Sequence, residues 1–233
     1  MITLQTFGPG MGMPDPSPFV MKAMMLLKLA GLEYREERAD VRKAPKEKLP
    51  VLIDDGVKIP DSTFMRFHIE KKYGFDFDSG HSAAQKGHAW AIEKMLEDHL
   101  YWVMVHERWM IDTNFNKGDV HFFEQVPALI RPFVIRAVRK QQRVKLNAQG
   151  MGRHTRAEII QLACRDIDAI ADVLGDNTYL TGARPCGADA ALFPFSWGIL
   201  NPLFETPVRD YMQTKANLLA YVARMKSQYF PGF

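Results

Sequence analysis

Residues 48–62 read Lys-Leu-Pro-Val-Leu-Ile-Asp-Asp-Gly-Val-Lys-Ile-Pro-Asp-Ser and hold the clearest fold signal of this 233-residue chain. Two short apolar strands flank an Asp-Gly turn, which is typical of a β-hairpin. Pro50 precedes the first strand, and a cis bond there costs an X-Pro unit only about 0.5–1 kcal/mol. Asp61 and Ser62 then begin a helix. This order predicts a small-molecule site built mostly from backbone.

The same stretch offers polar groups of two kinds. A cis bend at Pro50 leaves the backbone of Leu49 free to pair with an extended peptide. Asp61 and Ser62 supply an acceptor, a hydroxyl and the N–H groups of a helix N-terminus, which suit a carboxylate. The alternative is an ordinary strand start with a trans proline, followed by a plain helix cap.

The residues upstream predict a strand, a helix and a second strand. Ser17 and Pro18 are typical of a helix N-cap and first helical position, and Gly31 and Gly74 are typical of helix ends. The expected elements are strands at Ile2–Phe7, Glu33–Ala39, Val51–Ile53 and Val57–Ile59, and helices from Ser17 to near Gly31 and at Thr63–Tyr73. Val41–Lys48 is expected to be a basic loop or short helix.

The remainder of the chain has helical periodicity from Ser82 onward. Strands first and helices afterwards predict an α+β protein with two domains, at residues 1–78 and 82–233, joined by a linker near Phe75–Gly80. Thr155 and Glu158 form a capping-box pattern. The expected helices are Ala83–Ile111, Val120–Gln141, Arg156–Leu174, Ala188–Leu200 and Thr214–Gln228.

Composition excludes several classes of protein. With 47% hydrophobic and 24% charged residues the chain is not expected to be disordered, and its net charge of +3 implies no nucleic-acid partner by itself. Its longest apolar stretches are broken by charge well short of the roughly 20 residues needed to span a bilayer. Cys164 and Cys186, both expected in helical regions, suggest a reducing compartment rather than a disulfide scaffold. Arg131–Lys145 contains six cations and no acid. This segment is either a solvated helix face or a surface for an anionic membrane or nucleic acid.

Further motifs resemble one family. Leu-Pro-Val-Leu and Asp-Ser at this separation, with Ser17-Pro18-Phe19 before them, resemble the glutathione S-transferase superfamily. Within it, the chain resembles the branch of failed axon connections and metaxin-like proteins. The other matching pieces are Glu97–Trp102, Gly150–Glu158, Tyr179–Gly182, Ala188–Phe193 and Tyr229–Pro231. The resemblance implies a thioredoxin-like glutathione-binding domain followed by an all-helical domain.

The resemblance makes Ser17 the candidate catalytic residue. A thiolate at a helix N-terminus is stabilised, and a serine hydroxyl can donate a further hydrogen bond to it. The alternative is that Ser17 only caps its helix. The first strand ends without the tyrosine of tyrosine-type members, and neither Ser17 nor Val20 is a cysteine. Mixed-disulfide chemistry is therefore not expected, and Thr6 remains a substitute donor to the thiol.

The resemblance also assigns residues to glutathione. The backbone of Leu49, held by Pro50, would pair with the cysteinyl part. Ser62 would bind the γ-glutamyl carboxylate, and Asp61 would lie near its ammonium. A lysine would bind the glycyl carboxylate; Lys46 is the named candidate, and the sequence does not choose among it, Lys43 and Lys48, which all precede the turn.

A second substrate is expected between the domains. An apolar wall for a hydrophobic electrophile would be formed by four residues at helical spacing: Tyr101, Trp102, His106 and Trp109. Aromatic stripes also occur in cores, which is the alternative. The histidines lack the spacing of metal ligands, so no metal is expected. Asp189 is expected to cap its helix rather than to act in catalysis.

The sequence is thus interpreted as a serine-type glutathione transferase that uses glutathione as co-substrate. The protein is expected to act in detoxification, to be cytoplasmic, to form a homodimer, and to need neither nucleic acid nor a membrane anchor. The alternatives are a non-enzymatic interaction module of metaxin-like type, and a glutathione-dependent peroxidase, reductase or isomerase.

Overall fold

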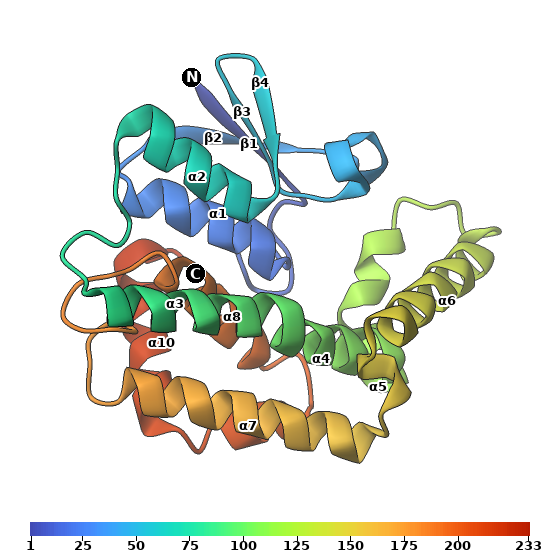
Figure 1. Ribbon diagram of the computed structural model, residues 1–233. Coiled ribbons are helices and arrows are strands. Elements are labelled where there is room, and N and C mark those ends of the chain that lie inside the picture. Colours follow the sequence, from blue (N-terminus) through green and yellow to red (C-terminus); the bar gives the residue numbers. More distant parts are fainter. The chain divides into compact units, whose positions relative to one another are not determined.

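The computed structural model describes residues 1–233, and these divide into two compact units (Figure 1). The first unit comprises Met1–Glu93, Val173–Gly198 and Asn217–Phe233, and the second comprises Lys94–Asp172 and Ile199–Ala216. A thioredoxin-like N-terminal half precedes a helical C-terminal half, as the sequence predicted. The predicted domain boundary between residues 78 and 82 stays a prediction.

The first unit contains one mixed four-stranded sheet, with strand order β2-β1-β3-β4. The strands are β1 (Ile2–Thr6), β2 (Tyr34–Arg38), β3 (Val51–Asp54) and β4 (Val57–Pro60). Strand β1 pairs parallel with β2 and antiparallel with β3, and β3 forms the predicted hairpin with β4. The connection from β1 to β2 passes through helix α1 (Pro18–Leu29), as a parallel pair requires.

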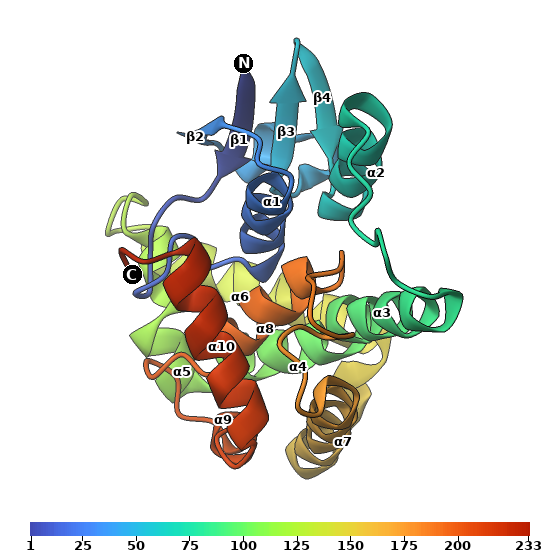
Figure 2. The same cartoon turned by 90° about the vertical axis from the view of Figure 1, so that its left-hand side faces the viewer.

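Helices α1 and α2 (Ser62–Tyr73) contact each other beside the sheet (Figures 1 and 2). Each begins at a residue whose side chain accepts a backbone N–H: Ser17 for α1 and Asp61 for α2. Helix α2 ends at Gly74, whose φ of 67° is left-handed and therefore favours glycine. Local capping signals thus fix where both helices begin.

The helical half follows the predicted pattern in most places. The helices are α3 (Ala83–Met95), α4 (Tyr101–Val105), α5 (Asp112–Lys117), α6 (Arg131–Gln149), α7 (Arg156–Leu174), α8 (Asp189–Ile199), α9 (Pro207–Met212) and α10 (Ala216–Tyr229). The predicted capping box is present, since the Thr155 N–H donates to Glu158 and the Glu158 N–H donates to the Thr155 hydroxyl. None of the helices is both long and apolar enough to cross a membrane.

The segment predicted as one helix at Ala83–Ile111 is interrupted. Two π-helical turns, Leu96–Leu100 and His106–Met110, flank α4. A π turn inserts an extra residue and so rotates the side chains that follow it. The regular helical spacing assumed for this segment therefore does not hold along its whole length.

The predicted helix Val120–Gln141 is wrong at both ends. Asp119–Phe123 is a 3₁₀ turn, and α6 begins only at Arg131, with a proline in its first turn. Pro127 lies between the two, and a proline inside a helix removes a hydrogen bond and clashes with the preceding turn. The residues after Gln141 contain no helix breaker, so the helix continues to Gln149 and is capped by Gly150.

Cys186 is also misplaced by the sequence, because it lies in the loop before α8 rather than in a helix. Its neighbour Asp189 is fully buried at the start of α8. The Asp189 carboxylate accepts the backbone N–H groups of Leu180 and Cys186 and the hydroxyl of Tyr221. Asp189 thus holds the preceding loop and α10, rather than capping the N–H groups of its own helix as the sequence had suggested.

Candidate active site

Ser17 caps α1 in a way that leaves its hydroxyl proton available. The Ser17 Oγ accepts the backbone N–H of Val20 at 3.4 Å and donates to no group in the protein. The side chain is half-buried, in extended backbone just before Pro18. One oxygen can therefore cap the helix and still donate a hydrogen bond to a ligand at the positive end of the helix dipole.

Asp15, which the sequence analysis did not single out, holds the loop that carries Ser17. Its carboxylate is fully buried and accepts the backbone N–H groups of Phe7, Gly8 and Ser17 at 2.9, 3.0 and 2.8 Å. Burial raises the pKa of Asp15 to about 7, although the three N–H donors act in the opposite direction. The sequence did contain a signal for this role of Asp15, namely an acidic residue between two prolines in a glycine-rich loop.

Thr6, the substitute donor, lies at the end of β1. Its side chain is 1% exposed, and its hydroxyl has no hydrogen-bond partner. A buried hydroxyl without a partner costs free energy relative to a paired one. The Thr6 hydroxyl is therefore unpaired but covered, whereas Ser17 is half-buried and the more accessible of the two.

The Leu49–Pro50 peptide bond is cis, as the sequence suggested. Strand β3 begins only at Val51, so Leu49 lies outside the paired part of the sheet. The Leu49 backbone makes no hydrogen bond in the protein, whereas its side chain is buried. An N–H and a C=O at the end of a strand can accept an extended peptide by strand pairing.

Asp61 and Ser62 lie at the start of α2. Asp61 has a φ of 79°, which is strained for any residue with a side chain, and its carboxylate accepts the Thr63 N–H at 2.9 Å. Strain of this kind concentrates at binding sites. The buried Ser62 follows as the first helical residue. Its hydroxyl and the N–H groups of the first turn that Asp61 does not accept could bind an anion.

Lys46 is the predicted lysine for which the structure gives a contact. Its ammonium lies 4.5 Å from the ring centroid of Phe64, in the first turn of α2. The side chain of Phe64 is 53% exposed, so the lysine is held near solvent. A cation on an aromatic ring at this helix N-terminus adds positive charge there, which would favour an anion.

A buried ion network joins the two helices that carry these residues. The ammonium of Lys22 on α1 lies 2.9 Å from Glu93 and 3.3 Å from the hydroxyl of Thr63 on α2, and Lys22 and Glu93 are fully buried. Arg66 on α2 contacts Glu93 at 3.2 Å and also pairs with Glu70 and Asp78. Both helices begin on the same side in Figure 1, so the network holds their N-termini in a fixed relation.

The four residues of the predicted second-substrate wall lie in the second unit. Tyr101 and Trp102 contact each other edge-to-face, with ring centroids 5.3 Å apart, and burial raises the pKa of Tyr101. His106 lies 3.1 Å from the buried Glu107, and Trp109 packs in a ring cluster with Phe115. All four are half-buried, so their role in binding a second substrate stays a prediction.

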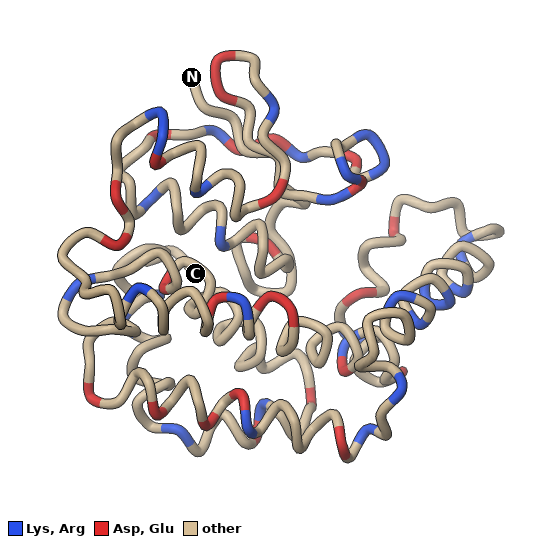
Figure 3. The backbone as a smooth tube through the Cα atoms, in the orientation of Figure 1, with Lys and Arg blue, Asp and Glu red and all other residues tan.

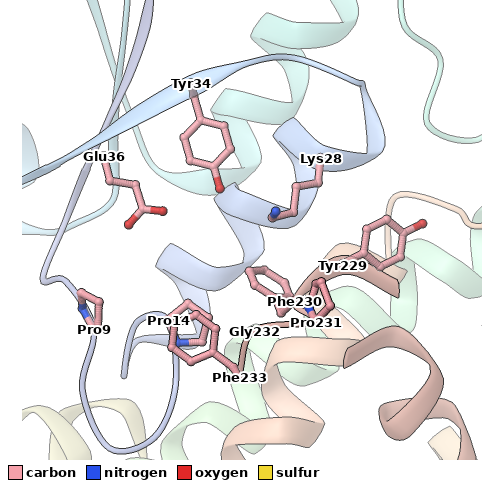
Figure 4. Close-up of a pocket in the computed structure, with 10 residues that line it drawn as sticks. All are labelled: Pro9, Pro14, Lys28, Tyr34, Glu36, Tyr229, Phe230, Pro231, Gly232 and Phe233. Atoms are coloured by element: carbon pink, nitrogen blue, oxygen red, sulfur yellow. The ribbon is translucent and has the colours of Figure 1, made fainter. Parts of the chain in front are cut away.

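A separate cavity of about 290 Å³ contains none of the predicted site residues (Figure 4). It lies in the first unit, between Lys28 on α1, strand β2 and the C-terminal segment Tyr229–Phe233. Tyr34 and Glu36 face it from β2, and burial raises the pKa of Glu36 although Lys28 lowers it. No group of His, Cys, Asp or Glu side chains is arranged to hold a metal ion.

Comparison with known proteins agrees with these features. Residues 18–114 match the glutathione S-transferase N-terminal domain family, and residues 163–225 match the glutathione S-transferase C-terminal domain family. An isoprene-epoxide–glutathione S-transferase of Rhodococcus sp. (strain AD45) is 31% identical over 98% of this chain and 99% of its own length.

More distant relatives include two other kinds of protein. Failed axon connections of Drosophila melanogaster is 30% identical over 95% of this chain and 56% of its own length. A metaxin-1 homolog of Caenorhabditis briggsae is 27% identical over 81% of this chain and 61% of its own length. The glutathione S-transferase of Ceriporiopsis subvermispora, solved in complex with glutathione, has the same fold, with a TM-score of 0.68 and 16% identity over 98% of this chain and 97% of that one.

Proposed function

Because the chain belongs to the glutathione S-transferase superfamily, we propose that it binds glutathione on its thioredoxin-like half and transfers the thiolate to a hydrophobic electrophile. The observation that supports this most is the hydroxyl of Ser17, which caps α1 and keeps a proton to donate. The similarity to a transferase named for an epoxide supports an electrophilic carbon as the second substrate.

Ser17 would act on the sulfur of glutathione. The N-terminus of α1 favours the thiolate, and the Ser17 hydroxyl donates a hydrogen bond to it. The thiol proton leaves to solvent. The sulfur then attacks the electrophilic carbon, a C–S bond forms, and the bond to the leaving atom breaks. That atom takes the electron pair and is protonated by water, which completes a conjugation.

The rest of glutathione would lie along residues of the first unit. The unpaired backbone of Leu49, positioned by Pro50, would pair with the cysteinyl part. The carboxylate of the γ-glutamyl part would bind Ser62 and the first N–H groups of α2, with Asp61 near its ammonium. Lys46 would bind the glycyl carboxylate, and Tyr101, Trp102, His106 and Trp109 would contact the electrophile.

A homodimer is part of the proposal. Phe64, Phe67 and Trp90 of the first unit are 53%, 44% and 43% exposed, and the rings of Phe67 and Trp90 stack with centroids 6.3 Å apart. Aromatic side chains gathered on a surface are characteristic of protein interfaces. We propose that this cluster contacts a second copy of the chain.

We also propose that the protein acts in the cytoplasm, in detoxification.

A non-enzymatic interaction module is the second candidate. The similarity to Failed axon connections favours it, as does the lack of a tyrosine or cysteine near the thiol position. The unused hydrogen-bonding groups of Leu49 and Ser62 argue against it, because a scaffold has no need of them.

Calorimetric titration with glutathione tests the proposal first. Wild type is expected to bind saturably, and Ser62→Ala is expected to weaken binding by about tenfold, the loss of one hydrogen bond to a charged group. Ser79→Ala, an exposed loop position, is the matched control. No binding at millimolar concentration would exclude the transferase and leave the interaction module.

Turnover with a general electrophile then tests Ser17. Ser17→Ala is expected to lower kcat about 10- to 100-fold, because a hydrogen bond to a charged group contributes about 1.5–3 kcal/mol. Ser17→Thr keeps the hydroxyl and the cap and is expected to retain most activity. If Ser17→Ala has unchanged turnover, the serine has no part in the chemistry.

A further inference from the structure

Helix α6 presents a surface that the transferase function does not use. Five exposed residues of this helix recur at intervals of three and four residues: Phe133, Arg136, Lys140, Arg143 and Val144. Such spacing places side chains on one side of a helix. We name these five residues the basic face. The opposite side of α6 holds the buried Leu146 and half-buried side chains, so the basic face points to solvent.

The charge of this region is uncompensated. No acidic residue occurs between Glu124 and Glu158, and Figure 3 shows cations along α6 with no acid among them. Arg139 on the same helix is used internally, because it pairs with Asp112 and donates to the carbonyl of Trp109. By contrast, the three cations of the basic face form no ion pair in the protein.

Apolar side chains accompany these cations at the start of the helix. The exposed fractions are 87% for Leu129, 49% for Ile130 and 74% for Phe133, and Val144, about three turns further on, is 59% exposed. Single exposed apolar residues are common on protein surfaces, but here four lie on or beside one cationic helix. The helix therefore combines positive charge with apolar side chains that could leave water.

We propose that the basic face of α6 docks on an anionic lipid bilayer. Arg136, Lys140 and Arg143 would contact lipid phosphates and carboxylates, and Leu129 and Phe133 would enter the boundary between headgroups and acyl chains. A nucleic acid would match the charge but would leave the aliphatic side chains in water. A second copy of this chain would bring its own cations against these, and like charges repel.

Co-sedimentation with vesicles tests the proposal with the full chain. Binding is expected to vesicles of phosphatidylcholine with phosphatidylserine and not to phosphatidylcholine alone, and to weaken as added salt shortens the screening length below about 8 Å. The variant Arg136→Gln/Lys140→Gln/Arg143→Gln is expected to lower the partition coefficient about a hundredfold, since each cation near a lipid surface contributes about one factor of five. Adding Phe133→Ser to this triple variant is expected to lower the partition coefficient further.

A second triple variant provides the matched control. Lys58, Lys71 and Arg165 are exposed cations on other elements, and their replacement by Gln changes the net charge by the same amount. This control is expected to bind phosphatidylserine vesicles as wild type does. Equal loss in both triple variants, or equal binding to both kinds of vesicle, would overturn the proposal.

Two further measurements separate the other partners. If Phe133→Ser converted a dimer into a monomer in sedimentation velocity, the face would be an interface between copies and the proposal would be wrong. The proposal would also be wrong if single-stranded RNA displaced the protein from the vesicles and Phe133→Ser left the binding to phosphatidylserine vesicles unchanged. The face would then be a surface for nucleic acid. Glutathione binding is expected to be unchanged in all these variants, so failure here leaves the proposed transferase function untouched.

Discussion

The guanidinium of Arg66 passes so close to Gly187 that a Cβ atom at this glycine would lie 2.2 Å from Arg66 Nη1. No side chain fits there without moving Arg66. The same guanidinium pairs with Glu70, Asp78 and Glu93, and Asp78 also accepts the backbone N–H of Gly187 at 2.9 Å. The loop before α8 and helix α2 are thus joined at a point that requires glycine.

Gly187→Ala is therefore expected to destabilise the fold by about 2–3 kcal/mol, in the range of overpacking in a filled core. Urea denaturation followed by circular dichroism measures this. Gly87→Ala on α3 is the control, because a Cβ there meets no atom within 4 Å. That control is expected to raise the free energy of unfolding by up to about 1 kcal/mol. Equal effects of the two variants would show that Arg66 can move freely.

Lys22 and Lys28 on α1 offer a comparison of a buried and an exposed cation. Lys22→Met leaves the carboxylate of Glu93 with one partner fewer at a fully buried position, and is expected to cost about 3–5 kcal/mol. Lys28, which lies over the ring of Phe230, is exposed, and Lys28→Met is expected to cost less than about 1 kcal/mol. Thermal denaturation of both variants checks this, and similar costs would contradict the importance of the buried pair.

The carboxyl group of Asp15 predicts a pH dependence of stability. Its folded pKa of about 7 lies above the ordinary aspartate value of 3.8, so the folded state holds a proton that the unfolded state releases. The contribution of Asp15 to stability is therefore present below about pH 4 and is lost as pH rises through 7. The side chain in the variant Asp15→Asn cannot titrate. The free energy of unfolding of wild type minus that of Asp15→Asn is expected to fall between pH 4 and 8.

Chemical denaturation of both proteins across that pH range makes the measurement. Parallel pH profiles of the two proteins would show that Asp15 does not change its protonation state there. Asp15→Ala is expected to be less stable than Asp15→Asn, because it leaves three backbone N–H groups without the acceptor they have now.

Substitution of Asp61 is expected to weaken glutathione binding without lowering the stability of the fold. Glycine accepts a φ of 79° without strain and loses only a few tenths of a kcal/mol as an N-cap, so Asp61→Gly is expected to be as stable as wild type or up to about 1 kcal/mol more stable. Glutathione binding is expected to weaken about tenfold through loss of the carboxylate. Asp55→Gly is the control, since Asp55 also has a positive φ of 49° but lies in the hairpin turn. Unchanged binding in Asp61→Gly would remove this residue from the site.

Local signals explain what the sequence predicted well. The Asp-Gly hairpin, the Ser17-Pro18 start of α1 and the Gly74 end of α2 each depend on neighbouring residues only, and all three are present. The buried pair of Lys22 and Glu93 could not be predicted in this way. Its partners are 71 residues apart, and a lysine among apolar residues of a helix gives no sign of which acid it meets.

The errors in the helical half have a related cause. Helix α6 begins later than predicted because Pro127 interrupts the chain ahead of it. The residues from Val120 onward nevertheless have helical periodicity, which suggested the earlier start. The two π turns around α4 have no periodicity of their own, since each is a local insertion within a helix. The caps at Ser17 and Asp61 and the cis bond before Pro50 were easier to predict because each depends on neighbouring residues, whereas their role in binding glutathione stays a prediction.

The network around Arg66 also constrains how this protein can change in evolution. Its members Lys22, Arg66, Glu70, Asp78 and Glu93 share contacts, and because Lys22 and Glu93 are fully buried, replacing either of them leaves the other charge with one partner fewer in the interior. Single substitutions at these positions are expected to be selected against, while paired substitutions that keep the charges balanced are tolerated. Divergent descendants should therefore show correlated replacement at these positions, and a bulkier residue at Gly187 should appear only where Arg66 has become smaller.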